Sequence, residues 1–66
     1  MTRWVVGVDI GGTNLVVGLV PVDGGPAEGV RSRATQSERG ADAAVVDIVR
    51  LSEDAIAEVL ERHSAT

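Results

Sequence analysis

The chain opens with a nearly continuous apolar run from Trp4 to Ile10, interrupted only by Gly7 and Asp9. β-branched residues favour extended backbone, and an apolar run without strict alternation predicts a strand that is buried on both faces. A second, valine-rich run follows a glycine turn, and Pro21 near its end cannot donate a hydrogen bond to a neighbouring strand. The two runs predict a hairpin with strands at about residues 3–10 and 14–22.

A weaker, polar alternation predicts a third strand at about residues 27–35, after the turn at Asp23-Gly24. Such a pattern is typical of an edge strand with one solvated face. Arg31 and Arg33 lie two residues apart and therefore share a face of this strand. We expect that face to be solvated.

The remaining third of the chain has helical periodicity and predicts an amphipathic helix at about residues 41–63. Asp42 suits the positive start of this helix, and Arg62 and His63 suit its negative end. Glu58 and Arg62, four residues apart, predict an ion pair along the helix. We expect the acidic residues, Asp47 and Glu58 among them, to be solvated. The face expected against the sheet contains Val45, Ile48, Val49, Ser52, Ile56, Val59 and Leu60.

The order of elements predicts a small α/β unit: a three-stranded antiparallel β-meander followed by one amphipathic α-helix. A chain of 66 residues buries only about 60% of the surface that it exposes when unfolded. One helix can cover only one face of such a sheet, so the other apolar face is expected to be open to water. We therefore expect residues 1–66 to form a single, incomplete unit.

Composition narrows the functional classes. The chain is 44% hydrophobic and 24% charged, which is typical of a globular protein, and its net charge is −4 with no lysine. That balance argues against a nucleic-acid partner, which clustered Lys and Arg would bind. With no cysteine and His63 as the single histidine, a disulfide or a Cys/His zinc site is excluded. The opening apolar run is too short and too interrupted for a signal peptide or membrane span, so we expect a cytoplasmic protein without a membrane partner.

The stretch that carries candidate chemistry is the glycine turn after the first strand, which contains Gly11, Gly12 and Thr13 and follows Asp9. Glycine can adopt positive φ and lets a ligand approach the backbone closely, so successive amides can point at phosphate oxygens. The Thr13 hydroxyl is a further donor, and Asp9 could hold Mg²⁺, which neutralises the phosphates. Asp9 could instead end the strand and cap the turn through its own side chain.

Two better-known phosphate loops do not fit this stretch. A Walker A loop requires a lysine, and the chain has none. A dinucleotide fingerprint has the spacing GxGxxG and opens into a helix, whereas Gly7, Gly11 and Gly12 have a different spacing and lead into valines. A phosphate cradle built on a hairpin remains.

The segment Val5-Val6-Gly7-Val8-Asp9-Ile10-Gly11-Gly12-Thr13-Asn14-Leu15-Val16-Val17-Gly18-Leu19-Val20 resembles the first phosphate motif of the ROK family of repressors and sugar kinases. The resemblance implies a partial ribonuclease H-like lobe of the actin-like ATPase superfamily. It also implies that Asp9 lies near Mg²⁺ and ATP, that Gly11, Gly12 and Thr13 cradle the phosphates, and that Asn14 borders the site. Family members often carry Lys at that last position, so Asn14 removes one positive contact to phosphate.

The resemblance implies transfer of a phosphoryl group from ATP to a hexose such as glucose. It also implies a protein whose partners are nucleotide, sugar, the remainder of the kinase fold and a second copy in a homodimer. The family's general base, sugar-binding residues and second phosphate loop have no counterpart here, so we nominate no catalytic residue and expect the chain alone to be inactive. Two alternatives stay open: a lobe of a sugar-sensing transcriptional repressor, and an inert truncated fragment. Trp4 and His63 are interpreted as a packing anchor and a solvated helix-end residue.

Overall fold

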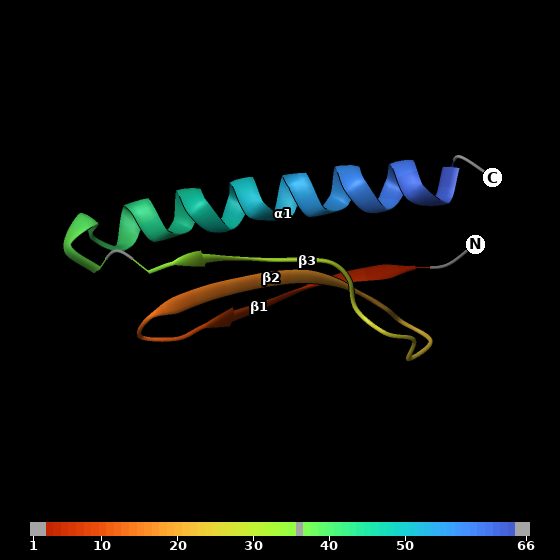
Figure 1. Ribbon diagram of the computed structural model, residues 1–66, viewed down its shortest axis with the longest axis horizontal. Coiled ribbons are helices and arrows are strands. Elements are labelled where there is room, and N and C mark those ends of the chain that lie inside the picture. Colours follow the sequence, from red (N-terminus) through yellow and green to blue (C-terminus); the bar gives the residue numbers. More distant parts are fainter. Residues whose placement is uncertain (1–2, 36, 65–66) are drawn as a thin grey trace.

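The computed structural model describes residues 3–35 and 37–64, which form two layers, a sheet and one long helix (Figure 1). The elements follow one another in the order β1, β2, β3, a short 3₁₀ turn and α1. Their bounds are Trp4–Ile10 for β1, Asn14–Pro21 for β2, Glu28–Ala34 for β3, Ser37–Arg39 for the 3₁₀ turn and Ala41–Ser64 for α1. The predicted β-meander followed by a single helix is confirmed, with each end within about two residues.

The sheet is antiparallel, with β2 between β1 and β3. β1 and β2 pair without interruption from Trp4 opposite Pro21 to Ile10 opposite Leu15. The amide of Val22 donates to the carbonyl of Arg3 at 2.9 Å, so bonded pairs alternate from Arg3 onward and Trp4–Pro21 is a non-bonded pair. Pro21 therefore ends β2 without costing the hairpin a hydrogen bond.

Pairing between β2 and β3 is interrupted by a bulge between Val17 and Leu19, opposite the first residues of β3. Gly29 has a φ of +65° at this point, a conformation that favours glycine. A Cβ on Gly29 would lie 3.1 Å from the Val59 side chain and 3.3 Å from the Ala55 carbonyl. The bulge therefore brings the backbone of β3 close against α1.

The hydrophobic core lies between β2 and α1. Its fully or nearly fully buried members are Val17, Leu19, Ala55 and Val59, and Trp4 and Leu51 pack against them. Alternation along β2 sends Leu15, Val17 and Leu19 toward the helix. The partial burial of Trp4 agrees with its interpretation as a packing anchor.

α1 presents a different face to the sheet from the one that its apolar pattern predicts. Val45, Val49, Ile56 and Leu60 were expected against the sheet, yet they are 57%, 50%, 39% and 62% exposed. The buried positions are Asp47, Ala55 and Val59, which corresponds to a rotation of about a quarter turn about the helix axis. Small residues at this face and Gly29 opposite it allow α1 to approach β3 closely.

Ion pairs between β3 and α1 accompany this rotation. Arg31 pairs with Glu58, and Arg33 lies 3.4 Å from the carboxylate of Asp47. The expectation of solvation is therefore wrong for Asp47, which is buried, and for Arg31 and Glu58, which are partly buried, because α1 lies over the face of β3 that carries the arginines. Arg33 remains exposed, although it is paired. The predicted helical pair between Glu58 and Arg62 is confirmed at 2.8 Å.

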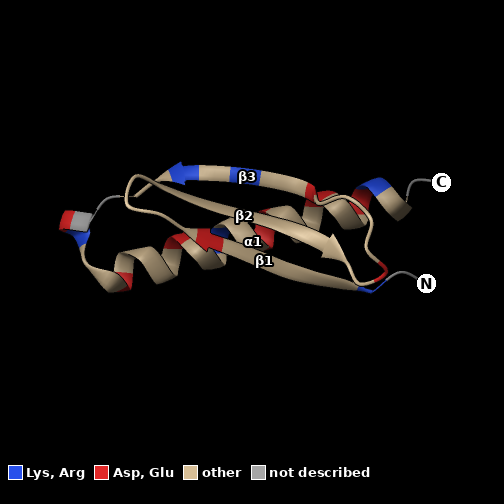
Figure 2. Cartoon of the chain, turned by 90° about the horizontal axis from the view of Figure 1, so that it is seen from below, with Lys and Arg blue, Asp and Glu red and all other residues tan. Residues whose placement is uncertain are grey.

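β1 is less buried than its sequence predicts. It was expected to be buried on both faces, but it lies at an edge of the sheet and α1 covers β2 and β3 instead. On the face toward α1, Val6, Val8 and Ile10 are consequently 38%, 43% and 63% exposed. The opposite face of the sheet has no covering layer in the described part of the chain, as expected, and Val5, Val20 and Val30 are exposed there. Figure 2 looks onto this uncovered face, with α1 behind it.

No helix among residues 3–35 and 37–64 is both long enough and apolar enough to cross a membrane.

Candidate functional site

The candidate site is the β1–β2 turn, which the structure places at one end of the sheet. The Gly11 amide donates to the Asn14 carbonyl at 2.8 Å, which closes the turn and leaves Gly12 and Thr13 at its tip. All four of these residues are exposed. Neither Gly11 nor Gly12 has positive φ, so the conformational freedom that the sequence analysis attributed to these glycines is not used here.

The end of β3 braces the turn from the side. The Thr35 amide donates to the Thr13 carbonyl at 2.9 Å, and the Thr35 hydroxyl donates to the Gly11 carbonyl at 3.2 Å. Two carbonyls of the turn are therefore held toward the sheet. Sequence reasoning missed Thr35, because these contacts join residues more than 20 positions apart and leave no local pattern.

The turn offers two amides rather than the three that the sequence nominates. The Gly11 amide is engaged within the turn, whereas the Gly12 and Thr13 amides have no hydrogen-bond partner in the described part of the chain. Unpartnered amides at neighbouring residues of an exposed turn form a small patch of positive partial charge. Such a patch suits an anion.

Gly12 has no structural requirement for glycine in this fold. Its φ is not positive, and a Cβ built on it would meet nothing within 4 Å. At Gly11, by contrast, a Cβ would lie 3.3 Å from the Asn14 carbonyl. A side chain at Gly12 would stand in open space, so the fold does not require the missing Cβ, and its absence leaves the approach to the neighbouring amides open.

Asp9 and Asn14 lie on the same face of the sheet, the one that α1 does not cover. Asp9 is opposite Val16, the second residue after Asn14, so the two polar side chains are diagonal neighbours across the strands. Asp9 is exposed and borders a shallow, mostly apolar hollow of about 310 Å³. The other residues that line the hollow are Gly7, Val8, Val16, Gly18, Val20, Ala27 and Val30.

Asp9 would provide a divalent cation with a single protein carboxylate as ligand. The described residues contain no group of three or more His, Cys, Asp or Glu that could hold a metal. Mg²⁺ commonly takes one or two carboxylates together with phosphate oxygens and waters, so a single Asp near two unpartnered amides is compatible with Mg-nucleotide but not with a free metal ion.

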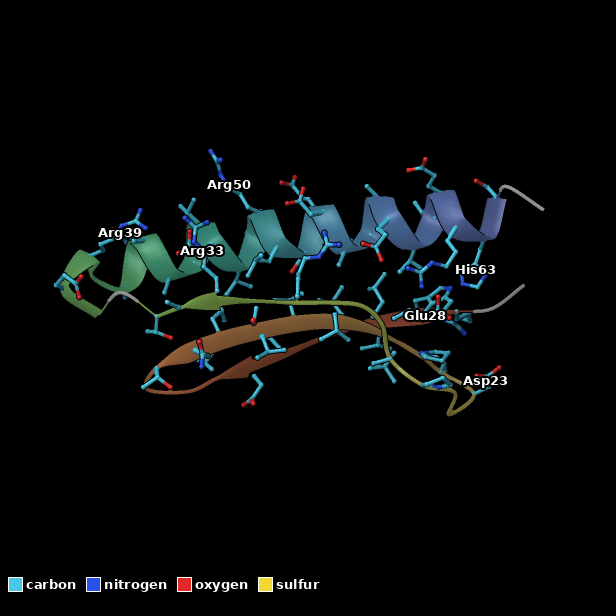
Figure 3. All side chains as sticks on the ribbon, viewed as in Figure 1. Asp23, Glu28, Arg33, Arg39, Arg50 and His63 are labelled. Carbon is cyan, nitrogen blue, oxygen red and sulfur yellow. The ribbon has the colours of Figure 1, made fainter. Side chains whose placement is uncertain are left out.

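A second hollow, of about 240 Å³, lies on the other side of the turn, between the end of the sheet and the start of α1. None of the five nominated residues lines it. Its polar members include Asp47, which is buried and faces Arg33 at 3.4 Å and Arg39 at 3.8 Å (Figure 3). These ion pairs supply a structural role for the acid and its arginines.

His63 belongs to a cluster at the opposite end of the molecule. Its Nε2 lies 2.9 Å from Glu28, and its ring centroid lies 5.3 Å from that of Trp4. Arg62 contacts the same carboxylate at 3.2 Å. The cluster joins the end of α1 to the starts of β1 and β3, so the structure gives this exposed histidine a tertiary role at the helix end (Figure 3).

No protein family, curated protein or solved structure matches this chain. Evidence for the function of this chain therefore comes from the geometry of the turn and from the sequence resemblance of its residues.

Proposed function

We propose that the β1–β2 turn is a phosphate-binding element for Mg-nucleotide of the ROK sugar-kinase type. The observation that carries the proposal is the pair of unpartnered amides at Gly12 and Thr13. Gly12 is also a glycine that folding does not require. In this proposal the two amides and the Thr13 hydroxyl bind phosphate oxygens. Asp9 holds the magnesium directly or through water, and Asn14 borders the site on the same face.

The activity that this element would serve is transfer of a phosphoryl group from ATP to a hexose hydroxyl. Phosphoryl transfer depends on positioning both substrates and on stabilising the charge that spreads over the transferred group. The turn contributes to the second requirement and to the position of the nucleotide. The proposed fold relationship, a partial ribonuclease H-like lobe, is supported by the antiparallel meander, by the hairpin that carries the phosphate turn and by the helix that follows.

The test is a titration of Mg-ATP into the chain, followed by the amide resonances of Gly11 to Asn14. We expect saturable shifts at Gly12 and Thr13 with smaller shifts elsewhere, and weaker shifts when Mg²⁺ is omitted. Gly12→Ala should reduce affinity about tenfold without loss of thermal stability, because its methyl group occupies the approach to the amides.

The matched control is Asp23→Asn, at the turn that joins β2 to β3 at the opposite end of the sheet, compared with Asp9→Asn. Asp9→Asn should remove the Mg²⁺ dependence, and Asp23→Asn should leave it intact. No shift at millimolar nucleotide would favour an inert fragment and reject the proposal. An equal Mg²⁺ dependence in Asp9→Asn and Asp23→Asn would reject Asp9 as the residue that holds the magnesium.

A further inference from the structure

The peptide group that joins Gly11 to Gly12 has a glycine on each side. Glycine restricts its backbone dihedral angles less than any other residue, so a peptide plane between two glycines can rotate at little cost. In one orientation this plane presents the Gly12 amide to an approaching phosphate. In the reverse orientation it presents the Gly11 carbonyl oxygen, which repels the phosphate. A contact that selects the first orientation would therefore favour binding.

Thr35 makes a contact of this kind with the Gly11 carbonyl. Its hydroxyl donates to that carbonyl at 3.2 Å, and the carbonyl has no other hydrogen-bond partner in the described part of the chain. Because the carbonyl and the amide of a trans peptide point in opposite directions, the Gly12 amide is directed away from Thr35.

The position of Thr35 sets the side to which this amide points. Thr35 directly follows β3 and shares a face of that strand with Arg33, which pairs with α1. It also lines the hollow of about 240 Å³ at the start of α1. Asp9 and Asn14 lie on the opposite face of the sheet. An amide directed away from Thr35 is therefore directed toward the face that carries these two residues.

A backbone hydrogen bond holds Thr35 in place for this contact. The Thr35 amide donates to the Thr13 carbonyl at 2.9 Å, which extends the β2–β3 ladder one pair beyond Asn14 and Ala34. The peptide group between Gly12 and Thr13 has no such contact among the described residues. Loss of the Thr35 hydroxyl should therefore affect the Gly12 amide more than the Thr13 amide.

Fold stability gives a weaker reason for this hydroxyl. Thr35 is only partly buried, and its bond to the Gly11 carbonyl is exposed to water. The backbone bond from Thr35 to Thr13 does not involve the hydroxyl, so the end of β3 stays attached to the turn without it.

We propose that Thr35 is a positioning residue of the phosphate turn, whose hydroxyl holds the peptide between Gly11 and Gly12 in the orientation that offers the Gly12 amide to phosphate. Thr35 itself contacts neither phosphate nor magnesium in this proposal. The donor is ordered before the ligand arrives, which reduces the ordering that binding requires. This role rests on the proposed function, because it requires that the turn bind phosphate.

The first measurement uses the chain without nucleotide and compares the parent with Thr35→Val and Thr35→Ser. Valine keeps the branched shape and the backbone amide but lacks the hydroxyl, whereas serine keeps the hydroxyl. We expect a Gly12 amide order parameter of about 0.85 in the parent and in Thr35→Ser, and below about 0.6 in Thr35→Val. A Gly12 amide with the same order parameter in all three chains overturns the proposal.

The second measurement is a titration of Mg-ATP into the same three chains, followed by the amide resonances of the turn. Thr35→Val should bind about fivefold more weakly than the parent, and Thr35→Ser within about twofold of it, because one hydrogen bond separates the two variants. The nucleotide-dependent shift of the Gly12 amide should fall more in Thr35→Val than that of the Thr13 amide. A loss of affinity that serine does not rescue would contradict a role for the hydroxyl.

Ser64→Ala is the matched control, because the Ser64 hydroxyl donates to the Glu61 carbonyl at 3.3 Å at the far end of α1. Ser64→Ala and Thr35→Val should both melt within about 5 °C of the parent, since each loses one exposed hydrogen bond. Only Thr35→Val should change the affinity for Mg-ATP. If the parent binds Mg-ATP and Thr35→Val binds equally well, Thr35 has no positioning role and the proposed function stands. If the parent does not bind, the proposed function fails and the role of Thr35 fails with it.

Discussion

Glycine residues in this chain have different physical requirements, although the sequence makes them look alike. Gly29 combines a φ of +65° with close contacts to α1, whereas Gly24 has a φ of +95° in open space. Gly12 has neither positive φ nor a close neighbour. Only the last of these can accept a methyl group without strain, which makes Gly12 the informative position for ligand binding.

Substitution of two of the positive-φ glycines, Gly24 and Gly29, should separate backbone strain from steric overlap. Gly24→Ala should lower the free energy of unfolding by about 1 kcal/mol, because alanine disfavours this conformation. Gly29→Ala should lower it by about 3 kcal/mol, since its methyl group also meets Val59 at 3.1 Å. Urea unfolding measures both values. Equal losses in the two variants would mean that α1 does not approach β3 as closely as the structure indicates.

The fold perturbs the ionisation of Glu28. Its hydrogen bond with His63 lowers the pKa of the carboxyl, and Arg62 adds to this lowering, while partial burial acts in the opposite direction. A lowered pKa in the folded state means that the carboxylate stabilises the fold above its ordinary pKa. That contribution disappears as the pH falls through the folded-state pKa.

We expect the melting temperature of the chain to exceed that of Glu28→Gln at neutral pH, with a difference that shrinks as the pH falls from about 5 to about 3. Glu61→Gln serves as the control, because Glu61 is exposed on α1 and its side chain makes no hydrogen bond or ion pair in the described part of the chain. A difference between Glu28→Gln and the parent chain that does not vary with pH in this range would contradict the contribution assigned to the cluster.

At the scale of elements, the orientation of α1 is the feature that packing decides. The helix has more apolar positions than one face can hold, so its periodicity alone does not specify which of them meets the sheet. The structure selects the face with Ala55 and Val59, where small side chains lie against Gly29 and acidic residues reach the arginines of β3. Asp47 is buried there with two arginines nearby.

Two valines on α1 test this orientation. Val59 is 1% exposed and Val49 is 50% exposed, although the sequence pattern assigns them to the same face. Val59→Ala should lower the free energy of unfolding by about 2 kcal/mol through lost burial and a cavity, and Val49→Ala by less than about 0.5 kcal/mol. Comparable losses of unfolding free energy in the two variants, measured by chemical unfolding, would mean that α1 has the orientation that its periodicity predicts.

The whole molecule is thin, with extents of 43 × 21 × 14 Å and one buried layer between β2 and α1. A molecule of these proportions keeps several valines of the sheet in contact with water, which favours association through further pairing or packing. The two hollows described above are open to solvent, so neither of them aligns two substrates with water excluded.

We therefore expect the 66-residue chain alone to show no hexose-dependent release of ADP from Mg-ATP, even where Mg-ATP binds the turn. The physical reason is that one phosphate turn and one carboxylate do not position a hexose hydroxyl for transfer. A coupled assay for ADP with glucose present checks this, and the same assay without glucose is its control. Turnover that depends on glucose would show that the described residues contain more of the catalytic machinery than we assign.

The sequence by itself determined the number and order of the three strands and the long helix. Local chemistry suffices for these: valine-rich runs favour extended backbone, glycine turns end them, and a period of three to four apolar residues favours a helix. It also singled out the glycine turn as the candidate site, from residues that are adjacent in the chain.

Only the tertiary structure decided which surfaces meet. It placed β1 at an edge, rotated α1 toward β3, engaged the Gly11 amide within the turn and brought Thr35 against it. These outcomes depend on contacts between distant residues, such as Gly29 with Val59 and Arg33 with Asp47, whose energies depend on close approach in space. Periodicity along the chain contains no information about such distances, because the same apolar pattern can bury more than one face of a helix or either edge of a strand.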